Sequence, residues 1–328
     1  MTDPVEMSYS EAIRCALVRA MESDPEVFLM GEDIGVYGGA FGVTRGLWER
    51  FGPERIVETP ISEAGFVGVA AGAAMLGARP VVEIMFSDFL ILAFDQLINH
   101  AGKFHYMYGE QARVPMVVRM PTGAGRGYGP THSQSVEAFL LHAPGIKVVA
   151  PATPQDAYSL LLASIADDNP VVFLEHKLLY AAKGPVDETL PVPLGRAALL
   201  RQGSHVTVVA YSWMVHQALR AATELAAEGI EIEVIDLRTL APMDMETVVR
   251  SVAKTGRAVV VEEGTRTCGV AAEVTARIME EAFDLLEGPV KRVTFPDVPV
   301  PSSMVLESAA LPDARKIAAA ARQLCAEA

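Results

Sequence analysis

The stretch Glu58–Ala74 reads ETPISEAGFVGVAAGAA, and its second acid, Glu63, directly precedes a long run of small and apolar residues. After Glu63 no charged residue occurs before Arg79. Such a run predicts a buried helix that begins at Glu63 and ends at Gly77. An acid at the start of a buried helix needs an explanation, because removing a carboxylate from water is costly.

Glu63 has two interpretations from the residues alone. In the structural one, the helix dipole stabilises an acid at the helix N-terminus. In the functional one, the glycines and alanines after Glu63 let another element approach closely, and packing there compensates for the low helix propensity of glycine. A carboxyl group enclosed by such packing could hold and pass on a proton near neutral pH.

Composition places the chain among folded proteins and excludes several functions. The 328 residues suit two domains, and 51% of them are hydrophobic. The formal net charge of -14 argues against general binding of nucleic acid or of an anionic membrane, which needs basic patches. We find no signal, transit or membrane-spanning pattern. Cys15, Cys268 and Cys325 are far apart and odd in number, so we expect free thiols in a reducing, cytoplasmic setting.

The order of the predicted elements indicates two doubly wound α/β domains. Apolar strands are expected near 27–30, 55–58, 81–86, 114–120, 147–150 and 170–175, with helices between them, including 8–23, 43–51 and 89–104. The pattern Ser8-x-x-Glu11 predicts a capping box at the start of the first of these helices. Nearly continuous apolar strands between helices are typical of a parallel sheet covered on both faces. The proline-rich range 181–204 is interpreted as a linker between a domain over 1–180 and a smaller α/β domain over 205–328.

Common catalytic motifs are missing from the sequence. The glycine loop GAGRGYGP at 123–130 follows a strand, but the third glycine of a dinucleotide fingerprint would fall on Tyr128. Pro130 then interrupts the loop before a helix can begin. No phosphate-binding P-loop, no H-E-x-x-H and no G-x-S-x-G occurs. A nicotinamide-binding oxidoreductase is therefore a disfavoured alternative.

His132, in PTHSQS at 130–135, is the second candidate residue. It follows the strand predicted over 114–120, and loops after the carboxyl ends of parallel strands form the ligand crevice of such sheets. An idle, exposed loop histidine is the competing interpretation.

Several segments together resemble one enzyme family. They are TPISEAGFVGVAAGAA, EIMFSDFLILAFDQLINHAGKFHYMYG, THSQS, PGIKVVAP and DDNPVVFLEHKLLY, followed in the second domain by IDLRTLAPMDMETV and TGRAVVVEE. The chain resembles the β subunit of the thiamin-diphosphate-dependent dehydrogenase component of 2-oxo acid dehydrogenase complexes. This resemblance extends over essentially the whole chain.

The resemblance implies a transketolase-like pyrimidine-binding domain followed by a transketolase C-terminal-like domain. It also implies an α₂β₂ heterotetramer in which the α subunit holds the diphosphate and its Mg²⁺ through a G-D-G motif. This chain contains no G-D-G; its nearest string is GED at 31–33. A lipoyl acyltransferase core is the expected second partner, docked through the C-terminal domain.

By resemblance, Glu63 hydrogen-bonds a ring nitrogen of the cofactor's aminopyrimidine and exchanges a proton with it. His132 is expected to stabilise cofactor-bound intermediates or to assist transfer to lipoyl groups. Ile61, Met85 and Phe89 match positions that line the pyrimidine pocket, and Phe89 would offer an aromatic face to the ring.

A potassium site is a further implication, carried by SIADDNP at 164–170. Its expected ligands are main-chain carbonyls and side-chain oxygens, which suit a hard cation, from Met116, Ser164, Ile165, Asp167 and Asn169. A helix end that turns before Pro170 explains the same residues without an ion.

The substrate is less defined than the family. Pyruvate, in the reaction that acetylates lipoyl groups, is the leading candidate, acetoin comes next, and branched-chain 2-oxo acids also match parts of the chain. An assembly subunit without catalytic activity is the alternative of a different class. The presence of Glu63 and His132 in matching segments argues against it.

Overall fold

The computed structural model describes residues 4–326, which form two compact units. The first unit comprises the described residues up to Thr122 together with Phe139–Leu194. The second comprises Gly123–Ala138 and the chain from Gly195 onward. The glycine loop and His132 therefore group with the second unit, although they lie inside the range 1–180 in the sequence. The range 181–204 contains two short strands, one in each unit.

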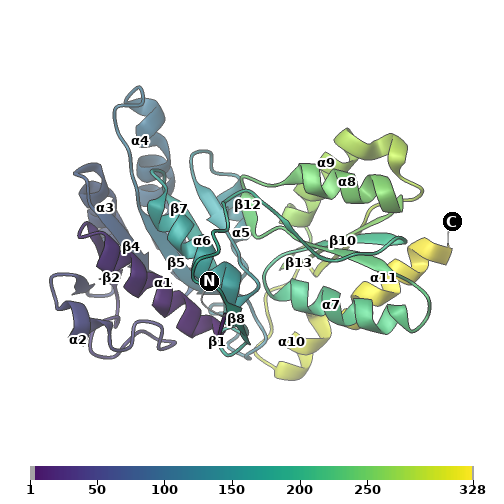
Figure 1. Ribbon diagram of the computed structural model, residues 1–328, viewed down its shortest axis with the longest axis horizontal. Helices are drawn as coiled ribbons and strands as arrows, with labels where there is room; N and C mark the ends of the chain where they lie inside the picture. The colour runs from purple at the N-terminus through teal and green to yellow at the C-terminus, as the bar shows by residue number, and fades with distance from the viewer. Residues whose placement is uncertain (1–3, 327–328) are drawn as a thin grey trace. The chain divides into compact units, whose positions relative to one another are not determined.

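A twisted parallel sheet forms the centre of the first unit (Figure 1), and the prediction of parallel strands is confirmed. Its strands lie in the order β6-β7-β5-β4-β2-β3. They are β2 (Val27–Gly31), β3 (Ile56–Glu58), β4 (Arg79–Glu83), β5 (Val117–Thr122), β6 (Lys147–Val149) and β7 (Val171–His176). The separate strand β1 (Val5–Ser8) pairs antiparallel with β8 (Lys183–Val186).

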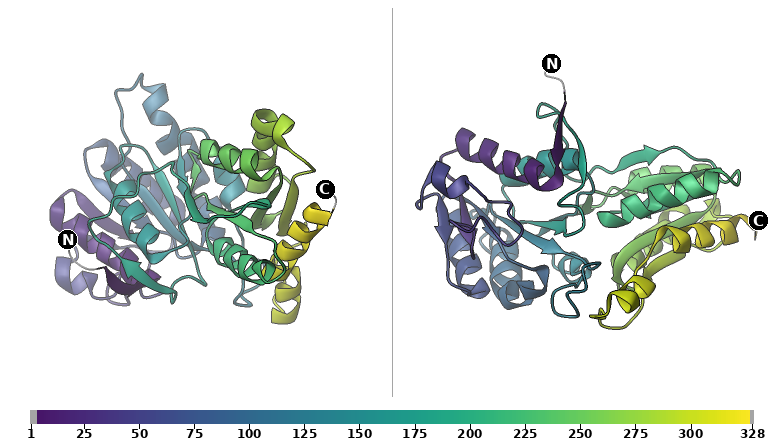
Figure 2. Two further views of the ribbon diagram at one scale, coloured as in Figure 1. Left: turned by 45° about the vertical axis from the view of Figure 1, so that its right-hand side comes forward. Right: turned by 90° about the horizontal axis from the view of Figure 1, so that it is seen from below.

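Helices cover both faces of this sheet. The helix α1 (Tyr9–Ser23) begins with the predicted capping box, in which Ser8 and Glu11 bond each other's backbone N–H groups. It packs against α6 (Pro154–Ala166) on one face. On the other face, α3 (Glu63–Met75) packs against the segment that follows β4 (Figure 2).

The prediction of one long helix over 89–104 is wrong, because the segment forms three successive helices of different types. The structure has a 3₁₀ helix η1 (Ser87–Ala93), a π helix η2 (Asp95–Ala101) and then α4 (Gly102–Met107). The apolar run indicates a helix, but the packing partner α3 lies close. A Cβ atom on Gly68 of α3 would lie 3.2 Å from Cγ of Gln96 in η2. Local widening and tightening of the turns accommodates such close packing.

The second unit is a smaller α/β sheet in the order β14-β13-β10-β11-β9, parallel except for β9. The helices α8 and α9 pack together, as do α7 and α11, and Figure 1 shows the two pairs on opposite faces of the sheet. The strands of this sheet are β9 (Ala198–Arg201), β10 (Val206–Ala210), β11 (Ile232–Asp236), β13 (Ala258–Thr265) and β14 (Lys291–Phe295). The unit also contains the short strand β12 (Thr239–Ala241), which is not part of this sheet. The helices are α7 (Trp213–Ala226), α8 (Met245–Thr255), α9 (Val270–Ala282), η3 (Phe283–Leu285), α10 (Met304–Ala310) and α11 (Ala314–Ala326).

Two short helices complete the chain, α2 (Leu47–Phe51) and α5 (Glu137–Leu141). The helix expected over 43–51 is shorter because Gly46, at a φ of 80°, turns the chain just before Leu47. The short helix α10 (Met304–Ala310) was not predicted from the sequence. Among residues 4–326, every helix is too short or too polar to cross a membrane.

Candidate active site

The carboxyl ends of the parallel strands in the first unit gather the candidate residues at one edge of the sheet. Glu32 directly follows β2, and Glu63 lies five residues after the end of β3. Met85 and Phe89 follow the end of β4. Ligands of open α/β sheets bind at this edge, because the loops there surround a crevice.

Glu63 is the first residue of α3, and its side chain is buried, with 5% of its surface exposed. Ser62, at the N-cap, provides no side-chain hydrogen bond. Within residues 4–326 the Glu63 side chain makes no hydrogen bond. A buried acid whose acceptor atoms are unused is suited to a ligand rather than to stabilising the fold.

Glu32 is a site residue that the sequence analysis missed. It is also 5% exposed, and its Oε1 atom is buried without a hydrogen-bond partner. Burial, together with the negative charges of Glu63 and Asp33, raises the pKa of Glu32 to about 7. The available signal was its position: GED follows the apolar strand VFLM directly, at the functional edge of the sheet.

The three residues expected at the pyrimidine ring lie at the same edge. Ile61 precedes α3 and is 80% exposed, while Met85 and Phe89 are half-buried. Phe89 in η1 makes an edge-to-face contact with Phe86, at 6.1 Å between ring centroids. Contact of these residues with a cofactor ring stays a prediction.

A buried ionic network joins three strands of the same sheet. Arg119 of β5 donates two hydrogen bonds to Glu175 of β7, at 2.7 and 2.6 Å, and another to Glu83 of β4. Tyr180 donates its hydroxyl to Glu175 at 2.8 Å. Burial alone would lower the pKa of Arg119, but Glu175 and Glu83 raise it, so the guanidinium stays charged. The network ties three neighbouring strands together next to the site.

Aromatic side chains connect the loop after β2 to the same region. Phe41 stacks on Tyr180, at 5.2 Å between centroids, and meets Phe86 edge to face at 5.6 Å. The Lys177 ammonium lies 5.2 Å from the centroid of the Phe86 ring. These contacts hold the loop that begins with Glu32.

His132 belongs to the second unit, within the loop Gly123–Ala138. It is half-buried, and its Nδ1 atom lies 3.0 Å from Oγ1 of Thr131. Its backbone N–H donates to the carbonyl of Gly129 at 3.3 Å. Its catalytic role stays a prediction.

Two buried acids occupy the second unit near this loop. Burial raises the pKa of Glu137 to about 8, opposed by a backbone hydrogen bond and reinforced by the charges of Glu263 and Glu262. Burial also raises the pKa of Glu262 to about 7, although its carboxylate accepts the N–H groups of Ala271 and Val270 at the start of α9. Both groups therefore change charge near neutral pH, which the sequence did not indicate.

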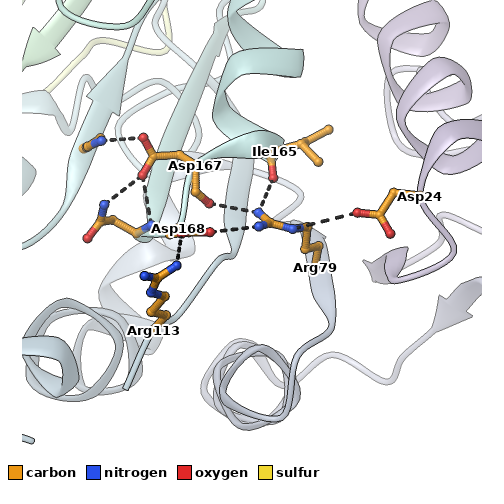
Figure 3. A network of polar contacts seen from close by, with 8 residues as sticks. Asp24, Arg79, Arg113, Ile165, Asp167 and Asp168 are labelled. Carbon is orange, nitrogen blue, oxygen red and sulfur yellow. Dashed lines mark hydrogen bonds and ion pairs between the residues drawn. The ribbon is translucent and has the colours of Figure 1, made fainter. Parts of the chain in front are cut away.

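The predicted potassium ligands belong to a loop held by two cationic side chains (Figure 3). Arg79 donates to the carbonyl oxygens of Ile165, at 2.9 Å, and Asp167, at 3.2 Å. It also pairs with Asp168, at 2.8 Å, and Arg113 pairs with the second oxygen of Asp168 at 2.5 Å.

The oxygens expected from Asp167, Met116 and Ser164 also have partners. The Asp167 carboxylate accepts bonds from Lys147 and Asn169, and these bonds lower its pKa although burial acts against them. The carbonyl of Met116 accepts the N–H of Val171 at 2.9 Å, and that of Ser164 accepts the N–H of Asp167 at 3.3 Å. Lys147 is thus a third protein cation at this loop, after Arg79 and Arg113, so a potassium ion would have to bind beside these three charges. The described residues contain no cluster of three or more acidic, histidine or cysteine side chains that could hold a metal ion.

Two families match consecutive parts of the chain. The transketolase pyrimidine-binding domain matches residues 5–183, and the transketolase C-terminal domain matches residues 195–317. A solved structure titled as a split-gene transketolase, an inactive β4 tetramer, superposes with a TM-score of 0.81 at 26% identity, over 98% of each chain.

Curated relatives match almost end to end. The β subunit of the pyruvate dehydrogenase E1 component from Rickettsia felis is 46% identical over 98% of this chain and 99% of its own. The mitochondrial β-1 subunit from Arabidopsis thaliana is also 46% identical, over 98% and 90%. The β subunit of the acetoin:2,6-dichlorophenolindophenol oxidoreductase from Cupriavidus necator is 45% identical, over 97% of each chain.

Proposed function

Because this chain belongs to the family of dehydrogenase E1-component β subunits with transketolase-like domains, we propose that it is the β subunit of a 2-oxo acid dehydrogenase. Pyruvate is the first candidate substrate, since relatives named for pyruvate dehydrogenase are 46% identical. Acetoin is a close second, because the relative named for acetoin is 45% identical. Branched-chain 2-oxo acids are the third candidate.

The observation that supports this function best is the pair of buried carboxyl groups at the sheet edge. Oε1 of Glu32 is buried without a hydrogen-bond partner. Glu63 is 5% exposed and its side chain makes no hydrogen bond within residues 4–326, so its carboxylate is available to a ligand. Unsatisfied buried acceptors are rare because each costs free energy, so a bound ring with nitrogen donors would satisfy them.

Thiamin diphosphate fits these two carboxyl groups. When bound, it supplies the electron sink that decarboxylation of a 2-oxo acid requires. Glu63 would bind a ring nitrogen of the aminopyrimidine and exchange a proton there. Glu32 would share that proton, because its pKa of about 7 lets it take up or release one near neutral pH. Ile61, Met85 and Phe89 would enclose the ring and exclude water.

The partners follow from the same proposal. An α subunit would hold the diphosphate and Mg²⁺ in an α₂β₂ heterotetramer, since this chain lacks the G-D-G string. His132 would act on the reacting groups or assist transfer of the acyl group to lipoyl of the acyltransferase core. A cytoplasmic location agrees with three free cysteines, Cys15, Cys268 and Cys325.

A substrate panel on the reconstituted pair of α and β chains tests the function. Pyruvate, acetoin and branched-chain 2-oxo acids are each supplied with an artificial electron acceptor, with and without thiamin diphosphate. We expect cofactor-dependent turnover of pyruvate or acetoin by the pair and none by this chain alone. Turnover of none of these substrates by a correctly assembled pair would overturn the proposal.

Potassium binding by the loop at 164–169 is proposed separately, in competition with the protein cations Arg79, Arg113 and Lys147. Replacing KCl with choline chloride at equal ionic strength should lower the thermal midpoint of the reconstituted enzyme if the ion binds. An unchanged midpoint would mean that Arg79, Arg113 and Lys147 close the loop without an ion.

A further inference from the structure

The glycine loop at 123–129 follows none of the phosphate-binding patterns, yet its backbone is highly specialised. Gly123, Gly125, Gly127 and Gly129 have φ values of 88°, 91°, 69° and 77°. Residues with a side chain are strained in this region, whereas glycine is not. Alternate left-handed residues turn successive N–H groups toward a common side, and such an arrangement binds anions.

The anions that this loop binds are two carboxylates of its own chain. The N–H groups of Gly125 and Gly127 donate to the two oxygens of Glu307, each at 2.9 Å. The N–H of Ala124 donates to Oε1 of Glu263 at 2.6 Å. Glu307 is only 1% exposed, and Glu263 is buried as well. Hydrogen bonds from N–H groups to buried carboxylates are among the stronger ones in proteins.

The segment that leads into α10 also packs directly on the loop. A Cβ atom on Gly127 would lie 3.0 Å from Cγ of Met304. A Cβ atom on Gly129 would lie 2.6 Å from Oγ of Ser302. The loop is therefore held by shape as well as by charge, which explains why glycine occupies alternate positions.

His132 is connected to this loop through the backbone. Its N–H donates to Gly129 at 3.3 Å, and the N–H of Gly123 donates to the carbonyl of Gln134 at 3.3 Å. The bonds to Glu307 therefore act on a closed loop that includes the histidine.

We propose that Glu307 is a positioning residue for His132: its carboxylate fixes the backbone of the glycine loop and thereby the place of the imidazole. The catalytic consequence rests on the proposed function, whereas the fixing of the loop does not. Since the N–H groups at 124, 125 and 127 are already bonded to carboxylates, we also infer that this loop does not bind the cofactor's diphosphate.

The loop contact is tested by amide hydrogen exchange on the full chain, in peptides that cover residues 123–131. In E307Q the amide group keeps one acceptor and turns a donor toward the loop, so exchange at Gly125 and Gly127 should accelerate by about tenfold or more. E307D keeps both acceptors and should restore most of the protection. E280Q, which removes an exposed charge from α9, is the matched control and should exchange like the wild type. Unchanged exchange in E307Q would overturn the proposal.

The positioning role is tested by a double-mutant cycle in the reconstituted enzyme. E307Q should lower kcat about tenfold with little change in KM, and should have no further effect once His132→Ala is present, because residues that act as one unit are not additive. Independent, multiplying effects of the two substitutions would overturn positioning. If His132→Ala retained full turnover, the role assigned to His132 would be wrong, and the exchange experiment would still decide whether Glu307 fixes the loop.

Discussion

Two buried glutamates, Glu63 in the first unit and Glu307 in the second, show opposite uses of the same side chain. Glu307 binds two backbone N–H groups through its two oxygens, so its charge is fully used inside the protein. Glu63 is also buried, at 5% exposure against 1% for Glu307, but its side chain makes no hydrogen bond within residues 4–326. A satisfied carboxylate stabilises a conformation, and an unsatisfied one is available for chemistry.

The groups that face the two acids also differ. Glu63 faces a second unsatisfied acid, Glu32, whose pKa is raised to about 7 by burial and by the charge of Glu63. Glu307 faces glycine N–H groups that only a left-handed backbone can present together. Burial alone therefore does not identify a catalytic acid. The number of satisfied acceptor atoms separates the two cases.

The largest expected effect is on turnover in E63Q. We expect kcat of the reconstituted enzyme to fall by roughly 10²–10⁴-fold, because the amide cannot exchange a proton with a bound ring. The thermal midpoint should stay within a few degrees of the wild type, since no internal hydrogen bond is lost. Wild-type turnover in E63Q would remove the distinction drawn between the two glutamates.

A large loss of stability is expected from Arg119→Met, because it leaves Glu83 and Glu175 buried without their cation. Breaking a buried ionic network in this way costs about 3–5 kcal/mol. The midpoint of thermal unfolding should fall by about 2–4 °C per kcal/mol. R113M, at an exposed pair with Asp168, is the control and should cost at most about 1 kcal/mol. Equal effects of the two variants would show that burial does not strengthen this network.

Glu32→Gln tests whether the unsatisfied acids act as a pair. We expect kcat to fall by about tenfold, less than in E63Q, because the proton is no longer shared. A pH profile of kcat should also lose the ionisation near pH 7 that belongs to Glu32. A profile that keeps this ionisation would assign it to another group, for which Glu262 at about 7 is available.

The smallest expected effect concerns Glu137, whose buried Oε2 has no hydrogen-bond partner. Its pKa is raised from 4.5 to about 8 in the folded state, so between these values the folded protein keeps a proton that the unfolded chain has released. The free energy of unfolding therefore falls as pH rises through this window.

E137Q removes this dependence. It should match the wild type near pH 5 and exceed it in stability by about 1 kcal/mol or more above pH 8, a difference that thermal unfolding at several pH values measures. A constant difference at all pH values would mean that packing, rather than ionisation, dominates at this position.

Local sequence patterns determined much of the fold. The capping box of Ser8 and Glu11, the apolar strands and the uncharged run after Glu63 each depend on neighbours within a few residues, and each formed as expected. The winding of 87–107 into η1, η2 and α4 could not be predicted, because packing against α3 decides it. The helix α10 was also missed, since a segment of one to two turns carries little periodic signal.

The sequence by itself determined that Glu63 is the first residue of a buried, glycine-rich helix. It also determined that the chain is built from parallel α/β sheets, because hydrophobic periodicity depends only on residues close together in the sequence. Only the tertiary structure decided which buried acids are satisfied. Glu307 reaches the N–H groups of residues 182 and 180 positions away along the chain. Glu32 and Glu63, from the ends of different strands, interact at one edge of the sheet. Hydrogen-bond satisfaction depends on atoms that folding brings together, and no local pattern of residues encodes it.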